Sequence, residues 1–333
     1  MSTDTFRYAA PADWPTHGIM KGARTLPRYP SLTSTVPKEL VHRAAVAEVL
    51  LTGWGRTDGG RFTASAQWPR GHSFFTPISG SHYDPLMIME TIRQVGSLIA
   101  HTEFDVPLGH QFLLRDLQVS VSPEHLRVEG VPAALDIEIT YTDVKRRRYG
   151  HAGAHYETVV SRDGQVVATG AATYTCTTPE VYQRVRGDRV LRGDWPQLQL
   201  TAPVSPQSVG RVSPIDVVLS PVGEAHRWQL RVDTRHPILF DHPVDHVPGM
   251  VLIEAARQAA TAVLKGTSLV SETELMPSRI VSKFRRYTEL DSPCLIEAHP
   301  IPTGPDEAAV LVTGLQNGDQ VFNCTVAADS AQL

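Results

Sequence analysis

Several features that mark other protein classes are scarce in this sequence of 333 residues. It has 3 widely spaced cysteines, which indicate neither a disulfide framework nor a cysteine metal site and fit a reducing cytoplasm. The net charge is −4, with both signs interspersed, so no nucleic-acid partner is expected. The richest apolar stretch, 250–264, is interrupted by Glu254 and Arg257 and is too short to cross a bilayer. The first residues lack the pattern of a secretory signal, so we expect a cytoplasmic protein without membrane contact.

The sequence does contain an internal repeat. Two histidines, a glutamate, an arginine and a glutamine recur in the same order at a constant offset (254 − 90 and 258 − 94 both give 164), while the apolar residues between them change. The pairs are His72 and His236, His82 and His246, Glu90 and Glu254, Arg93 and Arg257, and Gln94 and Gln258. This pattern predicts two copies of one domain, each with a polar cluster on a buried helix.

Each copy is expected to begin with a β-hairpin. In the first copy, β-like runs at 41–51 and 61–68 flank the turn 57–60. In the second copy, runs at 209–219 and 227–233 flank a turn at 221–224 that is about four residues shorter, as a surface loop tolerates.

A long helix and further strands follow each hairpin. Apolar residues cover most of the circumference of the helix around Glu90, which indicates burial on nearly all sides. The strands are expected at 111–122, 134–144, 152–161, 165–177, 278–287, 294–301, 308–316 and 320–327. This order predicts an α+β fold, a tandem (double) hot-dog, in which each repeat is a curved antiparallel sheet wrapped around a central helix.

The predicted domains are 36–178 and 205–330, joined by a surface linker at 179–204 that contains several arginines and prolines without clear periodicity. Two such repeats can satisfy each other as a pseudo-dimer, so the sequence leaves open whether the chain also forms a homodimer.

The start of the second helix resembles that of the hot-dog hydroxyacyl-ACP dehydratases, in which Pro-Gly opens the helix and a glutamate follows. Pro248, Gly249 and Glu254 match that spacing, but Phe240 stands where those enzymes have their catalytic histidine.

The chain as a whole resembles the A-factor synthase (AfsA) family of tandem hot-dog proteins over roughly residues 36 to 329. The resemblance rests on four segments, 68–75, 90–94, 109–112 and 240–249, with the last leading into the sequence Glu254-Ala-Ala-Arg257-Gln258. It implies transfer of a 3-oxoacyl group from acyl carrier protein to dihydroxyacetone phosphate. The ester then cyclises to a butenolide phosphate or a furan phosphate, on the way to bacterial signalling molecules. No cofactor is implied beyond the phosphopantetheine that carries the acyl group.

Such acyl transfer requires a base, donors for the oxyanion and a cation for the phosphate. We expect Glu254 or Glu90 to be the base, because burial raises a carboxyl pKa towards neutrality. Gly249 and Met250 offer free amides at a helix start. In the first repeat Asp84 is expected to cap the helix, and Pro85 has no N–H to donate, so the second repeat is favoured for the chemistry.

The arginines have two readings. Each lies three residues after its glutamate, on one helix face. Arg257 could bind the phosphate bidentately, because it is on the helix that carries the favoured base, and Arg93 is the second choice. The alternative is a buried structural Glu–Arg pair in each repeat.

The remaining candidates are histidines, glutamines and two basic runs. His72, His236, His242, His246, Gln94 and Gln258 are candidates for substrate binding, although His72 and His236 could instead anchor loops through hydrogen bonds. His242 and His246 with their neighbouring aspartates are too few for a metal site. The runs Lys145-Arg146-Arg147-Arg148 and Lys283, Arg285, Arg286 could dock the acidic carrier protein or the phosphate, or could simply be solvated faces.

Two other functions remain open at this point. One is a hot-dog dehydratase or thioesterase, and the other is a non-enzymatic protein that binds an acyl chain or another ligand. The repeated Glu–Arg pairs favour an enzyme over an inert binder.

Overall fold

The computed structural model describes residues 33–77, 79–147, 150–191, 198–266, 275–305 and 307–329. Residues 35–333 form one compact unit. No helix in the described ranges is long and apolar enough to span a membrane.

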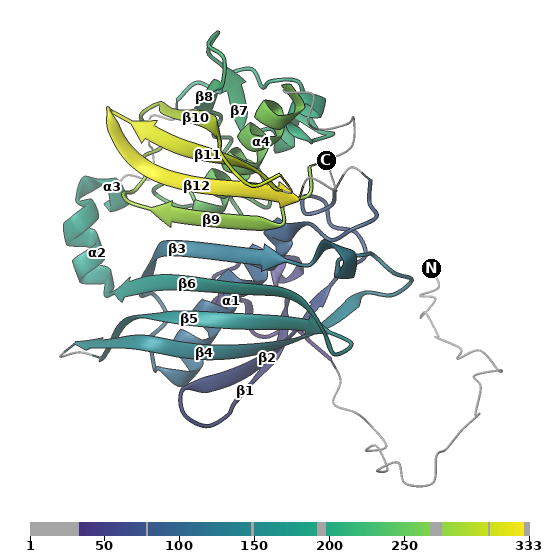
Figure 1. Cartoon of the computed structure of the whole chain (residues 1–333). Coiled ribbons are helices and arrows are strands. Elements are labelled where there is room, and N and C mark those ends of the chain that lie inside the picture. The colour runs from purple at the N-terminus through teal and green to yellow at the C-terminus, as the bar shows by residue number, and fades with distance from the viewer. Residues whose placement is uncertain are drawn as a thin grey trace, which may run out of the picture. The chain divides into compact units, whose positions relative to one another are not determined.

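Within the described ranges, twelve antiparallel strands form one continuous sheet in the order β1-β2-β4-β5-β6-β3-β9-β12-β11-β10-β8-β7 (Figure 1). The strands of the first half are β1 (Leu51–Arg56), β2 (Arg61–Trp68), β3 (Gln111–Val121), β4 (Ala133–Arg147), β5 (Gly150–Arg162) and β6 (Gln165–Thr177). Those of the second half are β7 (Leu219–Pro221), β8 (Arg227–Leu230), β9 (Arg279–Phe284), β10 (Cys294–Ile301), β11 (Glu307–Gln316) and β12 (Asp319–Asp329). The order reads the same from either edge, as two copies of one domain require.

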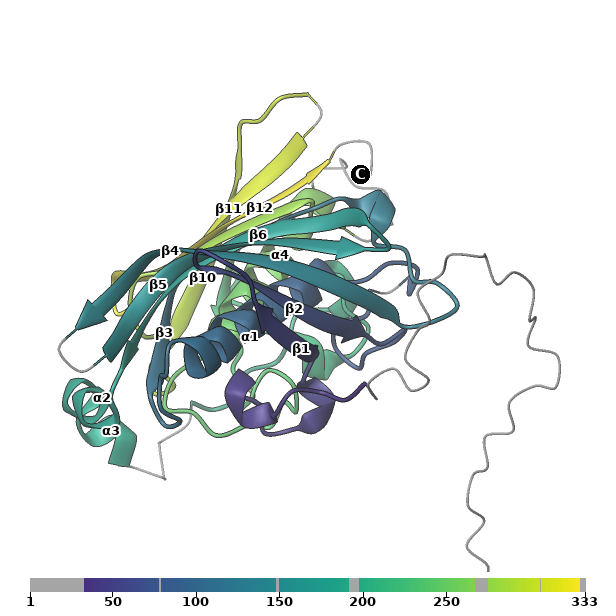
Figure 2. The same ribbon diagram turned by 90° about the horizontal axis from the view of Figure 1, so that it is seen from below.

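The two half-sheets join where β3 pairs with β9. Leu117 lies opposite Ser282, and the Ser282 hydroxyl also donates to the Leu117 carbonyl at 2.6 Å. Both central helices, α1 (Pro85–Glu103) and α4 (Gly249–Gly266), pack on the same face of this sheet (Figure 2). The predicted tandem hot-dog fold is therefore confirmed.

Helix α1 is apolar on nearly all sides, and its side chains form the centre of the first half. Leu86, Ile88, Met89 and Ile92 are fully buried, and burying each such side chain contributes about 1.5–3 kcal/mol. The helix begins where predicted because Asp84 accepts a hydrogen bond from the Leu86 amide at 2.8 Å and Pro85 fits the first helical position.

The first strand of each predicted hairpin is wrong over most of its length. The 3₁₀ turn Lys38–Val41 ends where the predicted strand 41–51 begins, and a second 3₁₀ turn, Val46–Glu48, lies inside it, so β1 starts only at Leu51. The second half has equivalent turns at Pro206–Val209 and Pro214–Asp216. The reason is a side chain: the Gln94 amide donates to the Glu48 carbonyl at 2.8 Å and accepts from the Leu50 amide at 3.0 Å. A helix glutamine thus replaces a neighbouring strand as the partner of this backbone.

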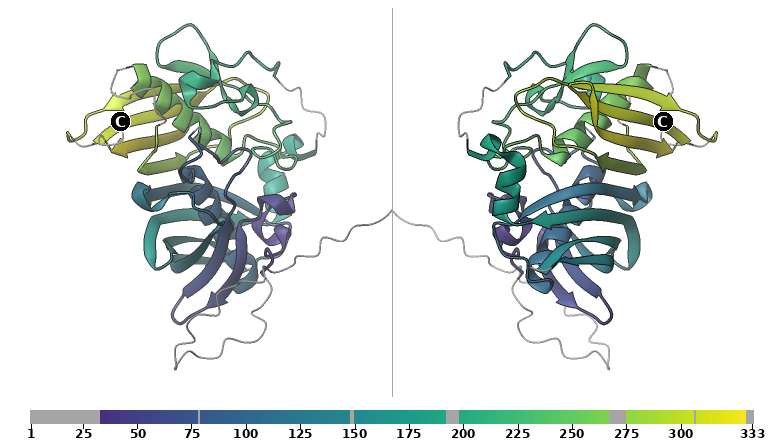
Figure 3. Two further views of the ribbon diagram at one scale, coloured as in Figure 1. Left: turned by 90° about the vertical axis from the view of Figure 1, so that its right-hand side faces the viewer. Right: turned by 90° about the vertical axis from the view of Figure 1, so that its left-hand side faces the viewer.

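The segment predicted as an irregular linker contains two helices, α2 (Pro179–Arg186) and α3 (Asp188–Leu191). Thr178 caps α2 by accepting a hydrogen bond from the Val181 amide, and Arg186 is buried among acidic groups of the second half. Helix α2 stands beside the junction of the two halves (Figures 1 and 3). The bounds 36–178, 179–204 and 205–330 stay a prediction about where the repeats end.

Candidate active site between the two repeats

Each central helix carries a buried carboxylate with three cationic or amide donors. In the first half Glu90 accepts from Arg43 at 3.0 Å, from Arg93 at 2.7 and 2.9 Å, and from Gln94 at 2.7 Å. Its side chain is 1% exposed. Burial alone would raise the pKa of Glu90, but the two arginines outweigh it and lower the pKa to about 2.

The second half repeats this arrangement. Glu254, which is 0% exposed, accepts from Arg211 at 2.8 Å, from Arg257 at 2.6 and 2.9 Å and from Gln258 at 2.6 Å. Burial is again opposed by its two arginines, which lower the pKa of Glu254 to about 2. The expectation of a raised carboxyl pKa is therefore wrong for both glutamates, because each is ionised and its oxygens are engaged by donors.

Arg43 and Arg211 are the residues that sequence reasoning missed. They lie 168 residues apart (211 − 43) rather than 164, because the four-residue difference in the hairpin turn falls between them and the helices. Their equivalence is visible in the sequence, because the predicted strands 41–51 and 209–219 both begin Val-x-Arg, at Val41 and Val209. A gap placed in the hairpin would have aligned the two arginines.

These two arginines also tie the halves together reciprocally. Arg43 donates to the Ile238 carbonyl of the second half at 3.3 Å, and Arg211 donates to the Phe74 carbonyl of the first half at 2.6 Å. Ile238 and Phe74 are themselves equivalent positions (238 − 74 gives 164). The Glu–Arg–Gln networks therefore stabilise the pseudo-dimer, and a lowered pKa of about 2 makes each glutamate a weak base.

His72 and His236 hold their own loops. In each, Nδ1 accepts two backbone amides and Nε2 faces a carboxylate, Glu48 at 3.4 Å for His72 and Asp216 at 3.1 Å for His236. The amides belong to Phe74 and Phe75 in the first half and to Ile238 and Leu239 in the second. Both ring nitrogens are occupied in each case, so the loop-anchoring alternative describes the geometry.

A cavity of about 260 Å³ lies between the two halves. One wall comes from α1 and β3 of the first half, through Arg93, Gly96, Ser97 and residues 111–114. The facing wall comes from the loop that precedes α4 and from the start of α4 itself. The cavity therefore combines groups from both repeats, whereas the sequence reasoning had sought the site within one repeat.

Two backbone amides at the start of α4 lie in the wall of this cavity. Gly249 and Met250 line the cavity, and none of the described residues accepts a hydrogen bond from either amide. At the equivalent position in the first half, Asp84 already occupies the Leu86 amide. The two repeats are thus unequal, and the α4 start offers the better place for a developing negative charge.

An aspartate and a histidine beside that helix start form an oriented pair. His246 Nδ1 lies 2.7 Å from an Asp245 carboxylate oxygen, which can only accept, so Nδ1 carries the proton and Nε2 keeps its lone pair. The His246 ring lines the cavity and its side chain is 29% exposed. Asp245 is held in turn by Tyr182 at 2.6 Å and Arg186 at 2.9 Å, both from α2.

The ionisation of Asp245 follows from these partners. Burial acts to raise its pKa, but the hydrogen bonds from His246, Tyr182 and Arg186 outweigh burial and lower it. An ionised carboxylate fixes the tautomer of His246 and leaves Nε2 as the nitrogen that can accept a proton, which is the arrangement a histidine general base requires.

The two helix arginines differ in exposure. Arg93 lines the cavity and is 22% exposed, whereas Arg257 is 5% exposed and is not among the cavity residues. His242 also lines the cavity, close to Asp241, whose carboxylate accepts from the amides of Ala44 and Ala45. The geometry therefore places Arg93, the second choice of the sequence analysis, in the cavity wall and leaves Arg257 outside it.

One of the two basic runs reaches the cavity. Arg286 lines it, and Lys283 and Arg285 are exposed next to it along the chain. In the other run, Lys145, Arg146 and Arg147 belong to β4, Lys145 and Arg146 are not among the cavity residues, and Arg148 lies outside the described residues.

The end of the cavity in the first half is apolar and aromatic. Phe112, Tyr156 and Tyr174 line it, and the Tyr156 hydroxyl donates to the Ile92 carbonyl at 2.8 Å. Gly96 is needed there, because an added Cβ would lie 2.4 Å from the Tyr156 oxygen. This wall suits an acyl chain.

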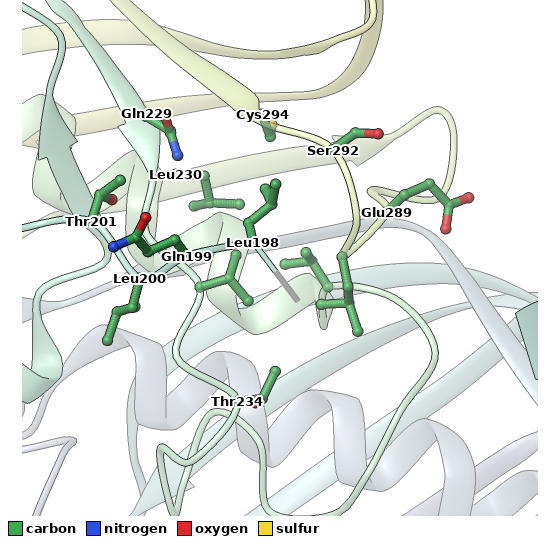
Figure 4. Close-up of a pocket in the computed structure, with 13 residues that line it drawn as sticks. Leu198, Gln199, Leu200, Thr201, Gln229, Leu230, Thr234, Glu289, Ser292 and Cys294 are labelled. Atoms are coloured by element: carbon green, nitrogen blue, oxygen red, sulfur yellow. The ribbon is translucent and has the colours of Figure 1, made fainter. Parts of the chain in front are cut away.

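A second cavity, in the C-terminal half, has a free volume of about 20 Å³ and is lined by residues that include Gln199, Thr201, Gln229 and Cys294 (Figure 4). Space of that size accommodates about one water molecule, so it is not a substrate site.

Comparison with known proteins places the chain in a family. The profile of the A-factor biosynthesis hotdog domain matches residues 25–178 and 195–328. The chain belongs to the A-factor synthase (AfsA) family. A relative from Streptomyces virginiae, named 2-oxo-3-(phosphooxy)propyl 3-oxoalkanoate synthase, is 52% identical over 89% of this chain and 98% of its own length. A relative of the same name from Streptomyces coelicolor is 41% identical over 87% of this chain and 90% of its own length.

Similarity to solved structures agrees on the fold of this AfsA family member. A structure described as an oleoyl thioesterase from Lactobacillus plantarum aligns with 82% of this chain and 97% of its own, with a TM-score of 0.51 and 10% identity. At that identity the likeness shows the hot-dog architecture alone.

Proposed function

We propose that this chain is an acyltransferase that joins a 3-oxoacyl thioester to dihydroxyacetone phosphate. The observation that carries the proposal is the cavity between the repeats, which brings the α4 amides, the Asp245–His246 pair and Arg93 to one place. Family membership supports it, since the relatives are named for an ester of a 3-oxoalkanoate with a 2-oxo-3-(phosphooxy)propyl group.

The proposed step uses groups of both halves. His246 Nε2 takes the proton from the acceptor hydroxyl as its oxygen forms a bond to the thioester carbonyl carbon. The Gly249 and Met250 amides stabilise the oxyanion of the tetrahedral intermediate. The carbon–sulfur bond then breaks, and the thiol leaves with the proton that His246 holds.

The product ester explains the cyclisation that follows. The carbon between its two carbonyl groups is acidic, and it can form a carbon–carbon bond with the ketone carbon of the dihydroxyacetone unit. Loss of water gives a butenolide phosphate, and an alternative closure gives a furan phosphate. The acyl group arrives on the phosphopantetheine of the donor, and we propose no separate cofactor.

Mass spectrometry tests the proposal directly. Purified protein with a 3-oxoacyl pantetheine thioester and dihydroxyacetone phosphate should form the phosphorylated ester or its dehydrated cyclic product. Free 3-oxo acid as the main product would support the thioesterase alternative and contradict transfer. His246→Asn should lower kcat by about 10²-fold or more. His82→Asn, its counterpart outside the cavity, should leave kcat unchanged.

The donor is proposed to arrive on acyl carrier protein. The exposed Lys283 and Arg285 lie next to the cavity residue Arg286, and acidic carrier proteins are attracted to such a surface. Lys283→Glu with Arg285→Glu should raise KM for the acyl carrier protein substrate but not for the short pantetheine thioester, and Lys145→Glu should raise neither. Equal effects of both variants on the carrier substrate would contradict this docking surface.

We also propose a cytoplasmic location. Cys294 and Cys324 are buried free thiols, which suits a reducing compartment. Periplasmic or secreted protein in a cell fractionation experiment would contradict it.

A further inference from the structure

His42 has a backbone conformation that ordinarily belongs to glycine. It ends the 3₁₀ turn Lys38–Val41 with φ 54° and ψ 52°, in the left-handed region. The equivalent residue of the second half (42 + 168) is Gly210, which ends its own turn with φ 71° and ψ 31°. The fold therefore requires this conformation twice, and only the copy beside the cavity places a side chain there. The side chain of His42, which lines the cavity, is therefore a difference between the two copies at a position where glycine meets the backbone requirement.

The hydrogen bonds of His42 define its tautomer. His101 Nδ1 lies 2.6 Å from the Val106 carbonyl, which can only accept, so this nitrogen carries a proton. In neutral His101 the other nitrogen, Nε2, then accepts, and it lies 2.8 Å from His42 Nε2. His42 must therefore donate from Nε2, which leaves its Nδ1 as a bare lone pair.

The groups around His42 are predominantly cationic. Burial first, and then the charges of Arg93, His101 and His242, lower the pKa of His42 to about 3. Arg93 and His101 come from α1, and His242 belongs to the loop before α4. The ionised Asp241 of the same loop is engaged by the Ala44 and Ala45 amides. His42 is therefore neutral at pH 7.

Arg93 is well placed to share a ligand with His42. Its Nε and one terminal nitrogen are committed to Glu90, and that same terminal nitrogen donates to the carbonyl of Val41, the residue before His42. No described residue accepts a hydrogen bond from its other terminal nitrogen. Arg43, Arg93 and Glu90 together leave one net positive charge next to the His42 ring.

We propose that His42 and Arg93 form the site for the phosphate of the acceptor, and that His42 takes up a proton at Nδ1 when the phosphate binds. The inference rests on the proposed function and deepens it by assigning one end of the acceptor. A bound dianion reverses the electrostatic environment that keeps His42 neutral. The proton comes from solvent, and the resulting imidazolium donates to a phosphate oxygen while Nε2 still donates to His101.

Calorimetry tests the proposal without any acyl donor, so its failure is distinguishable from failure of acyl transfer. Binding of dihydroxyacetone phosphate is measured at pH 8 in two buffers of different ionisation enthalpy. At that pH the ligand is already a dianion, since its second pKa is about 6, so proton uptake belongs to the protein. We expect net proton uptake that grows when the titration is repeated at pH 7.5 and pH 7.0, and none with dihydroxyacetone, which lacks the phosphate.

Variants separate His42 from the other histidines. His42→Gly should abolish the proton uptake and weaken binding on the order of 10-fold or more, because a charge-assisted hydrogen bond is lost. It should keep or raise the thermal midpoint, since glycine suits the backbone there. His82→Asn, outside the cavity, should keep both binding and uptake. If His42→Gly does not fold, His42→Asn serves instead, because asparagine tolerates the left-handed region.

Two results would overturn the proposal. One is unchanged proton uptake in a folded His42 variant. The other is unchanged binding of dihydroxyacetone phosphate together with a large loss of kcat, which would make His42 a base and not a phosphate ligand.

Discussion

Glu254→Gln should destabilise the protein more than it affects the chemistry. The change keeps the size and shape of the side chain but removes the charge that compensates Arg211 and Arg257, both of which are buried. Breaking a buried ion pair by removing one partner costs about 3–5 kcal/mol, because the remaining charges are left without compensation. Arg211 also donates a hydrogen bond to the Phe74 carbonyl of the other half, so the loss of stability extends to the contact between the two repeats.

The expected shift can be measured by thermal unfolding followed by circular dichroism. For a unit of this size, each kcal/mol corresponds to roughly 2–4 °C, so Glu254→Gln should lower the thermal midpoint by about 6–20 °C. Glu90→Gln should have a similar but smaller effect, since Arg93 is 22% exposed and solvent partly compensates it. Turnover of each folded variant should fall by much less than that of His246→Asn. A Glu254→Gln protein with an unchanged midpoint and a kcat lowered 10²-fold would refute this reasoning and restore Glu254 as the base.

Two further predictions concern charge. Because Glu90 and Glu254 have pKa values lowered from 4.5 to about 2, their contribution to the free energy of unfolding is complete above pH 4.5 and is lost as the pH falls from about 4.5 to about 2. Urea unfolding should show this loss in the wild type and a weaker one in Glu254→Gln. Equal pH dependence in both proteins would contradict the prediction. Arg93→Lys should raise KM for dihydroxyacetone phosphate by about 10-fold with the donor KM unchanged, whereas Arg257→Lys, outside the cavity, should not; the opposite ranking in steady-state kinetics would return the phosphate to Arg257.

The repeat made most of the fold predictable. A constant offset located both central helices, and the strand-like segments predicted after each hairpin correspond to β3 to β6 and β9 to β12. The first hairpin strands were mispredicted because Gln94 and Gln258 bind backbone groups that a strand neighbour would otherwise take. A side chain that replaces a neighbouring strand in this way produces no periodic pattern in the sequence. Helix α2 was missed because its eight residues are too short and too polar to show a clear apolar stripe.

The site was harder to predict because it depends on a tertiary contact between the repeats. The sequence identified Gly249, Met250, His246 and Arg93 as candidates, but it could not show that they share one cavity. It overvalued Glu254, since burial by itself raises a carboxyl pKa and the second arginine, Arg211, was not recognised. His42 carried no local signal, because its unusual backbone angle is visible only in the structure.

The central claim is that acyl transfer occurs at the start of α4, in the cavity between the repeats. The most direct measurement is a crystal structure of the protein with a non-hydrolysable 3-oxoacyl pantetheine analogue. The account predicts that the carbonyl oxygen of the analogue lies within hydrogen-bonding distance of the Gly249 and Met250 amides, with His246 Nε2 facing the carbonyl carbon. An analogue bound at the equivalent start of α1, beside Pro85 and Leu86, would contradict it.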